Sequence, residues 1–136
     1  DSIQAAFLNI KIKYLLKDTK KRINNANIYF RNLKSLNNIK LPITFKNFQN
    51  VYHQFVITVR KRDALKKFLL KNGIETQIHY KKILPSMQAY KHLHLKYKNF
   101  PNAFKASKEI LCLPIAPSLK HSNIKFIIYI LNKFFG

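Results

Sequence analysis

The stretch VYHQFVITVRKRDALKKFLLKNGIETQIHY (residues 51–80) decides the fold, because it holds a strand pattern, a helix pattern and a second strand pattern in succession. Residues 51–59 are rich in β-branched and aromatic side chains, which predicts a strand. The continuous apolar centre of this strand favours a central, covered position in a sheet. Residues 74–80 alternate with a period of two and predict a second strand.

The helix between these strands carries signals at both ends. Asp63 is a good N-cap residue, and Gly73 stands where a left-handed C-cap is wanted. Leu65, Phe68 and Leu69 have helical spacing and supply a stripe that we expect to be buried.

Upstream of this unit, residues 1–36 predict a long N-terminal helix. Ile3, Phe7, Ile10 and Tyr14 recur at the spacing of one helix face. Asp18 and Thr19 are polar, so this region is either one helix or two helices joined there. The helical spacing begins at Ile3, with no polar lead-in segment and no initiator Met before it. We therefore interpret the chain as the C-terminal part of a larger enzyme.

Downstream, the sequence predicts further helices and one more strand. MQAYKHL (87–93) predicts a short helix, and Pro101 opens another that runs through Ile110. LCLPIAP (111–117) holds a short third strand bounded by prolines. A final helix begins at an N-cap, Ser122, and buries a stripe made by Ile124, Ile127, Ile128 and Leu131.

These elements predict an α+β fold in which helices pack on a small two- to three-stranded sheet. At 136 residues, 47% of them hydrophobic, the chain fits a single domain over residues 1–136, with an α/β core over 51–136. One cysteine excludes an internal disulfide and favours a cytoplasmic location. The apolar stretches are too short to cross a bilayer.

A net charge of +21 is the strongest compositional signal. It fits a basic module that binds nucleic acid or another polyanion. It also fits compositional bias, because the basic residues are mostly lysines and Lys, Asn and Ile are the residues that an AT-rich genome over-supplies. A nucleic-acid site would more often favour arginine. Lysines are scattered, with local clusters at 20–22 and 60–62, and both interpretations stay open.

No catalytic constellation can be assembled from the residue types alone. The acidic residues are few and scattered, and two glycines cannot build a phosphate-cradling loop. His92 and His94 would diverge near a helix end, where a metal site needs convergent ligands. Cys112 fits a small buried residue better than a nucleophile. His79 and Tyr80 end a strand beside a proline-containing loop, where they either face a cleft or close the edge of the core.

The order of segments resembles the C-terminal part of the DegT/StrS family of sugar aminotransferases. DSIQAAFLNIKIKYL, the 51–80 stretch, MQAYKHL, FPNAFKASKEILCLPIAPSL and the closing helix carry this resemblance over essentially the whole chain. The combination of DSIQAA, YHQFVI and IHY is most similar to transaminases that act on keto-deoxysugar nucleotides.

The resemblance implies the small domain of a fold-type-I aminotransferase that depends on pyridoxal phosphate and works as a homodimer. The Schiff-base lysine and most cofactor ligands would lie in a missing large domain. The chain alone would then be an incomplete enzyme that binds no cofactor. It also implies that His79 and Tyr80 are substrate-side residues. We expect exposed apolar surface where the large domain docks, on the first helix.

One departure from the family pattern concerns the loop after these two residues. Family members commonly continue with a proline-rich turn and a further histidine, whereas this chain has Lys81, Lys82, Ile83, Leu84 and Pro85. A remnant of a decaying gene copy, without activity, is an alternative that the sequence does not separate from a working small domain. The sequence does not specify the sugar, the aminated carbon or the amino donor.

Overall fold

The computed structural model describes residues 1–136, with the side chain of Tyr97 excepted. Its α-helices and strands, in chain order, are α1 (Ser2–Ile12), α2 (Leu15–Leu33), β1 (Phe55–Thr58), α3 (Arg62–Lys71), α4 (Pro101–Glu109), β2 (Ile110–Leu113) and α5 (His121–Phe135). Three short 3₁₀ helices lie between α3 and α4, and they are η1 (Leu84–Ser86), η2 (Gln88–Leu93) and η3 (Tyr97–Asn99).

The sheet has two antiparallel strands, β1 and β2, in a register that pairs Phe55 with Leu113 and Thr58 with Ile110. One isolated bridge extends it on each side, from Lys40 to Thr58 and from Gln77 to Cys112. Helices with a small two-stranded sheet confirm the predicted α+β class, and the predicted second strand over 74–80 is reduced to the bridge at Gln77.

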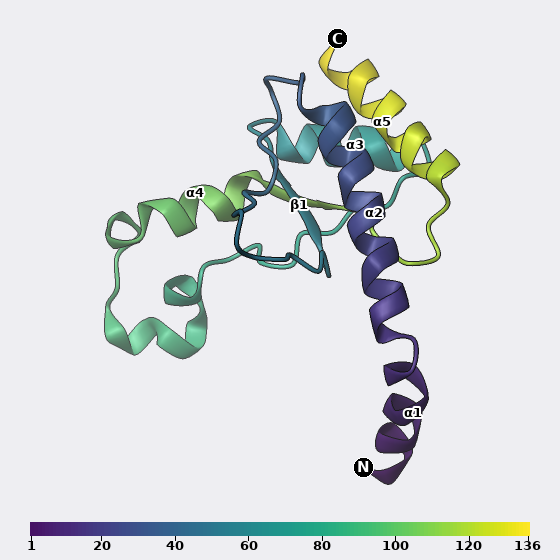
Figure 1. Cartoon of the computed structure of the whole chain (residues 1–136). Helices are drawn as coiled ribbons and strands as arrows, with labels where there is room; N and C mark the ends of the chain where they lie inside the picture. The colour runs from purple at the N-terminus through teal and green to yellow at the C-terminus, as the bar shows by residue number, and fades with distance from the viewer.

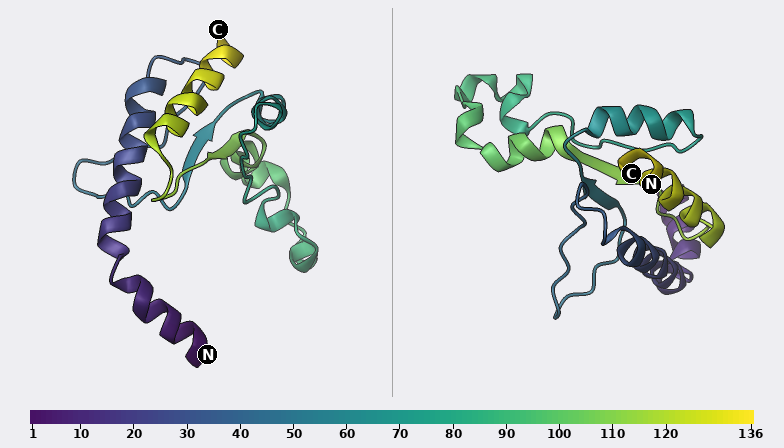
Figure 2. Two further views of the ribbon diagram at one scale, coloured as in Figure 1. Left: turned by 90° about the vertical axis from the view of Figure 1, so that its right-hand side faces the viewer. Right: turned by 90° about the horizontal axis from the view of Figure 1, so that it is seen from above.

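α5 lies between α2 and α3, and these three helices cover the sheet (Figure 2). The core between them is formed by buried side chains from every layer, and its fully enclosed members include Tyr29, Phe55, Leu65, Leu111 and Ile124. α1 projects away from this body and carries the N-terminus far from the C-terminus (Figure 1). α4 and the 3₁₀ helices form a second projection on the other side of the sheet (Figure 1).

The N-terminal region is two helices, and the break lies at residues 13–14 rather than at Asp18 and Thr19. Asp18 instead stands in the first turn of α2, where a carboxylate interacts favourably with the positive end of the helix dipole. The helical pattern of α2 ends at Leu33, three residues short of the predicted limit.

Of the two strands predicted in the 51–80 stretch, one is shorter than expected and the other does not form. β1 begins only at Phe55, because Tyr52 has a positive φ of 48° and turns the chain out of the extended conformation. The predicted strand over 74–80 is wrong, since only Gln77 pairs with β2. Beyond that bridge, the backbone of His79 is hydrogen-bonded to the thiol of Cys112 instead of continuing a ladder.

Two predicted helix caps are wrong, and one is confirmed. Asp63 lies inside α3, where its carboxylate accepts a hydrogen bond from Arg62, and Ser122 likewise lies inside α5. Gly73 has the left-handed conformation that the C-cap prediction requires, with φ of 74°. The N–H of Ile74 donates to the carbonyl oxygen of Leu69 at 2.9 Å, which closes the end of α3.

The predicted elements after residue 100 are confirmed in place, and the predicted helix at 87–93 differs in type. α4 begins at Pro101 and β2 follows it directly, while residues 88–93 form the 3₁₀ helix η2 rather than an α-helix. In α5 the predicted stripe is buried, and Ile130 joins it. No helix of the described residues is long and apolar enough to span a membrane.

Candidate functional site

The candidate substrate-side residues, His79 and Tyr80, lie at the end of an anchored segment. Ile74 and Thr76 are buried at its start, and Gln77 is held by two backbone hydrogen bonds to Cys112, at 3.2 and 2.8 Å. His79 and Tyr80 themselves are exposed, and 69% of Tyr80 is accessible to solvent. A fixed segment therefore presents both side chains outward.

Cys112 lies directly behind this segment, on β2. Burial raises the pKa of its thiol, and the backbone hydrogen bond from His79 acts in the opposite direction. A buried thiol with a raised pKa is a poor nucleophile. The prediction that Cys112 is a small core residue agrees with its 7% exposure.

No general acid–base partner or metal ligand set accompanies His79 and Tyr80. Among the described residues, no hydrogen bond or ion pair is found for the side chain of either one, and no three His, Cys, Asp or Glu residues converge on a point. His92 and His94 are both exposed to solvent.

The residues present do not fit pyridoxal phosphate. That cofactor needs a lysine held for Schiff-base formation and an acidic or basic partner for its pyridine nitrogen. Every lysine of this chain is at least partly exposed. The single ion pair found in the described part of the chain joins Arg62 to Asp63 and involves no lysine. No catalytic step through the cofactor can be derived from these residues.

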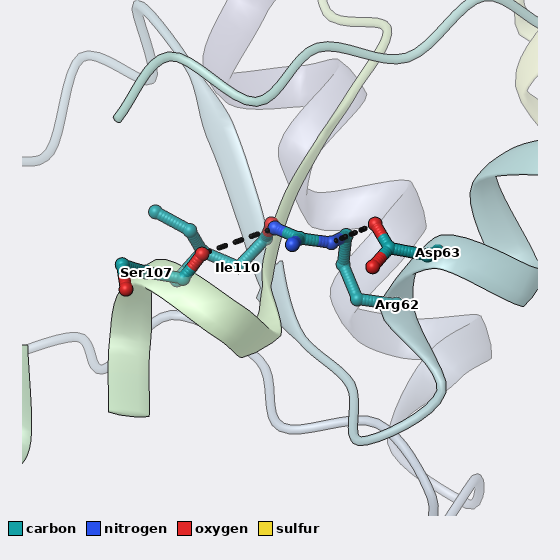
Figure 3. Close-up of polar contacts among 4 residues, drawn as sticks. All are labelled: Arg62, Asp63, Ser107 and Ile110. Atoms are coloured by element: carbon teal, nitrogen blue, oxygen red, sulfur yellow. Dashed lines mark hydrogen bonds and ion pairs between the residues drawn. The ribbon is translucent and has the colours of Figure 1, made fainter. Parts of the chain in front are cut away.

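A buried polar junction ties α3, α4 and β2 together. Arg62 is 8% exposed, and its guanidinium donates to the carbonyl oxygens of Ser107 at 3.2 Å and Ile110 at 3.3 Å (Figure 3). Its Nε donates to Asp63 at 2.6 Å. The sequence pattern placed Arg62 in a basic cluster at 60–62 and contained no signal that separates it from its exposed neighbours.

A second set of polar contacts fastens α2 to the segment between β2 and α5. The side-chain amide of Asn25 donates to the carbonyl oxygens of Ala116 and Leu119, and the hydroxyl of Tyr29 donates to that of Pro114 at 2.9 Å. Burial raises the pKa of Tyr29. α2 is therefore fixed to the body by hydrogen bonds as well as by apolar packing.

A large exposed apolar surface lies on α1 and the start of α2. α1 has no buried residue at all. The large apolar side chains of α1 and of residues 14–16 are each more than half exposed. They are Ile3, Phe7, Leu8, Ile10, Ile12, Tyr14, Leu15 and Leu16. Many exposed large apolar side chains on one helix are typical of an interaction site. The predicted exposure of the first helix is confirmed.

The sequence matches the model of a known protein family along almost its whole length. The model of the DegT/DnrJ/EryC1/StrS aminotransferase family matches residues 1–132. The chain belongs to this family. The resemblance inferred from its segment order is thereby confirmed, and the match extends from α1 into α5.

Individual relatives of this aminotransferase family are similar along nearly the entire chain. A dTDP-3-amino-3,6-dideoxy-alpha-D-galactopyranose transaminase of Aneurinibacillus thermoaerophilus is 29% identical over 134 residues, which are 98% of this chain and 36% of the relative. The crystal structure of DesV from S. venezuelae, in complex with a ketimine intermediate, is 29% identical with a TM-score of 0.94. It is matched over 98% of this chain and 36% of its own.

A third relative is a DegT DnrJ EryC1 StrS aminotransferase from Brucella abortus. Its crystal structure is 32% identical, with a TM-score of 0.91, and is matched over 100% of this chain and 36% of its own. The chain thus spans about a third of the length of the aminotransferases it matches.

Proposed function

We propose that this chain is the C-terminal small domain of a pyridoxal-phosphate-dependent aminotransferase that acts on keto-deoxysugar nucleotides. The observation that carries the proposal is the family match over residues 1–132, against relatives of which the chain covers 36%. Several relatives are named as transaminases of dTDP- or UDP-linked sugars, which supports a nucleotide-sugar substrate.

In this proposal the chain is a single domain that is catalytically incomplete by itself. The missing large domain supplies the Schiff-base lysine and the main cofactor ligands, because the residues of this chain do not fit the cofactor. The expected cofactor of the whole enzyme is pyridoxal phosphate, and the expected assembly is a cytoplasmic homodimer.

The apolar surface of α1 supports a docking role for that helix. Leaving Ile3, Phe7 and Leu8 in water forgoes about 1.5–3 kcal/mol of burial free energy for each side chain. A large domain packed on α1 would recover this energy and would fix the helix relative to the body. The dimer partner would complete the coverage.

His79 and Tyr80 are proposed to contact the substrate across the closed interface. Their exposure and their fixed position at the end of the Gln77 bridge support this role. The loop after them keeps Pro85 but lacks the additional prolines and the histidine of the family pattern. The substrate contacts of this chain therefore rest on His79 and Tyr80 more than on the loop.

The experiment that tests the proposal begins with the mass of the native polypeptide in its source cells, detected through peptides of residues 1–136. We expect a mass well above 16.1 kDa and transaminase activity in that longer polypeptide. The 136-residue chain should show no saturable binding of pyridoxal phosphate in equilibrium dialysis. A native mass of 16.1 kDa, or cofactor binding by the short chain, would contradict the proposal.

The role of His79 and Tyr80 is tested in the longer polypeptide with His79→Ala and Tyr80→Phe. We expect a lower kcat/KM for the sugar nucleotide and unchanged pyridoxal phosphate content, because neither residue is placed at the cofactor. His92→Ala is the matched control, since His92 is also an exposed histidine. Loss of cofactor content, or equal losses for His79→Ala and His92→Ala, would exclude a substrate-side role.

A further inference from the structure

A cleft of about 850 Å³ opens near the ends of α2 and α5 and the start of α3. This volume lies in the range of about 300–1,000 Å³ that is usual for small-molecule sites. Four of its lining residues are cationic, namely Lys40, Arg60, Lys61 and Lys105, and one, Glu109, is acidic.

The cationic residues that line the cleft come from three separate segments. Lys40 lies in the loop after α2, Arg60 and Lys61 lie between β1 and α3, and Lys105 lies on α4. Since the described residues contain one ion pair, between Arg62 and Asp63, no carboxylate neutralises any of these four cations. The cleft therefore carries four unpaired positive charges against one negative charge.

The backbone that carries these cations is fixed by the contacts behind it. The N–H of Lys40 donates to the carbonyl oxygen of Thr58 at 3.0 Å, and the N–H of Thr58 donates back at 2.9 Å. Arg62 binds the end of α4 to the start of α3 through Ser107 and Ile110 (Figure 3). This junction fixes the segment of Lys61 relative to the helix of Lys105. The backbone that carries the four cationic side chains is therefore preorganised, so less conformational entropy is lost when they bind an anion.

We propose that this cleft is a binding site for a phosphorylated small molecule. Several cations around a recessed space match the charge density of a phosphate or diphosphate group. The half-buried rings of Phe134 and Phe135 provide an apolar wall for the rest of the ligand. A nucleic-acid strand would instead need a cationic groove with aromatic stacking platforms that follows the backbone over several nucleotides.

The position of the cleft makes the site compatible with a docked large domain. The ends of α2 and α5 lie at the C-terminal end of the molecule, whereas α1 and the N-terminus lie at the opposite end (Figure 1). The proposal is independent of the proposed function, since it uses none of the residues assigned to docking or to the substrate.

The test is isothermal titration of the 136-residue chain with inorganic pyrophosphate at low ionic strength. The variant Lys61→Ala/Lys105→Ala removes two cleft cations, and we expect the affinity for pyrophosphate to fall by about tenfold or more. The control Lys67→Ala/Lys71→Ala removes the same charge from exposed positions on α3 outside the cleft, and we expect a change within about twofold. Circular dichroism confirms that each variant is folded.

Glu109→Gln is a second variant, for which we expect a change of affinity in the opposite direction. Removing the only carboxylate of the cleft should strengthen pyrophosphate binding by about threefold, because a like charge no longer opposes the ligand. Adenosine diphosphate should compete with pyrophosphate for the same site. The proposal is overturned if pyrophosphate does not bind, if both double variants lose affinity equally, or if single-stranded RNA binds more tightly and is unaffected by the cleft variant.

Discussion

α1 and α2 are consecutive helices with opposite relations to the rest of the molecule. α1, SIQAAFLNIKI, has the denser apolar sequence, yet none of its residues is buried. α2 is rich in lysine and asparagine, yet it buries Asn25, Ala26, Tyr29 and Leu33. The apolar content of a helix therefore does not decide its burial. Burial depends on whether the chain supplies a partner, and for α1 the chain supplies none.

Polar contacts make the same distinction between the two helices. Asn25 and Tyr29 reach the carbonyl oxygens of the 114–119 segment and so define one position for α2. The side-chain capping contact of α1 is local, from the N–H of Ile3 to the carboxylate of Asp1 at 3.1 Å. The position of α2 is thus fixed by contacts within this chain, whereas no tertiary hydrogen bond of the described residues fixes the position of α1.

The largest expected effect comes from removing the ring of Phe55. This side chain is fully buried, and its ring lies 4.8 Å from that of Tyr29 and 5.2 Å from that of Phe30. Phe55→Ala should lower the free energy of unfolding by about 3–5 kcal/mol, through lost burial and the cavity left behind. Urea denaturation followed by circular dichroism measures it. A loss below about 1 kcal/mol would contradict the assignment of Phe55 to the core.

A smaller effect is expected at the buried arginine. Arg62→Met keeps much of the aliphatic stem but leaves the carbonyl oxygens of Ser107 and Ile110 unpaired, at a cost of about 2 kcal/mol. The same urea experiment measures it. Arg31→Met is the control, because Arg31 is exposed on α2 and bonds only the carbonyl oxygen of Asn27 in the same helix. Equal effects at both positions would mean that the Arg62 junction does not stabilise the fold.

The hydroxyl of Tyr29 should contribute less than Arg62 but with a characteristic pH dependence. Tyr29→Phe leaves the carbonyl oxygen of Pro114 without its partner and should cost about 1 kcal/mol at neutral pH. Burial raises the pKa of Tyr29 above its ordinary value of 10.0, so the neutral phenol is favoured in the folded state.

The sign of this pH dependence follows from the raised pKa. Stability from the neutral phenol is fully present below pH 10 and is lost as the pH rises beyond it, since the unfolded state then releases its proton first. Tyr29→Phe should therefore make the loss of stability above pH 10 less steep. Part of the fall in unfolding free energy above pH 10 should remain in this variant, because burial raises the pKa of Tyr52 as well. An unchanged slope in urea denaturation at high pH would contradict the assignment.

The sequence predicts this fold best where the determining interactions are local. Gly73, the stripe of α5 and Pro101 at the start of α4 are set by helix geometry, and they were predicted correctly. The strand over 74–80 failed because pairing partners are far away in the sequence, and alternation alone does not show that a ladder stops after Gln77. The two N-cap predictions each missed by two positions, a common error at helix ends.

The candidate site was predictable only in part and for the same reason. His79 and Tyr80 could be selected as a polar pair after an apolar segment, and their exposure fits that selection. The cluster at 60–62 divides into Arg60 and Lys61 in the cleft and Arg62 in the interior. Neighbouring residues of one charge type are indistinguishable in sequence, and only the tertiary contacts assign them to different roles.

The smallest expected effect completes the comparison between the two helices. Phe7 is 60% exposed on α1, and Phe7→Ala should change the unfolding free energy of the 136-residue chain by less than about 0.5 kcal/mol. In the longer polypeptide, with a large domain docked on α1, the same substitution should cost several times more, because the ring would then leave a cavity. Urea denaturation of both polypeptides measures the difference. If Phe7→Ala destabilises the short chain as much as Phe55→Ala does, then α1 packs on this chain's own core in solution, and the apolar surface is not a docking site.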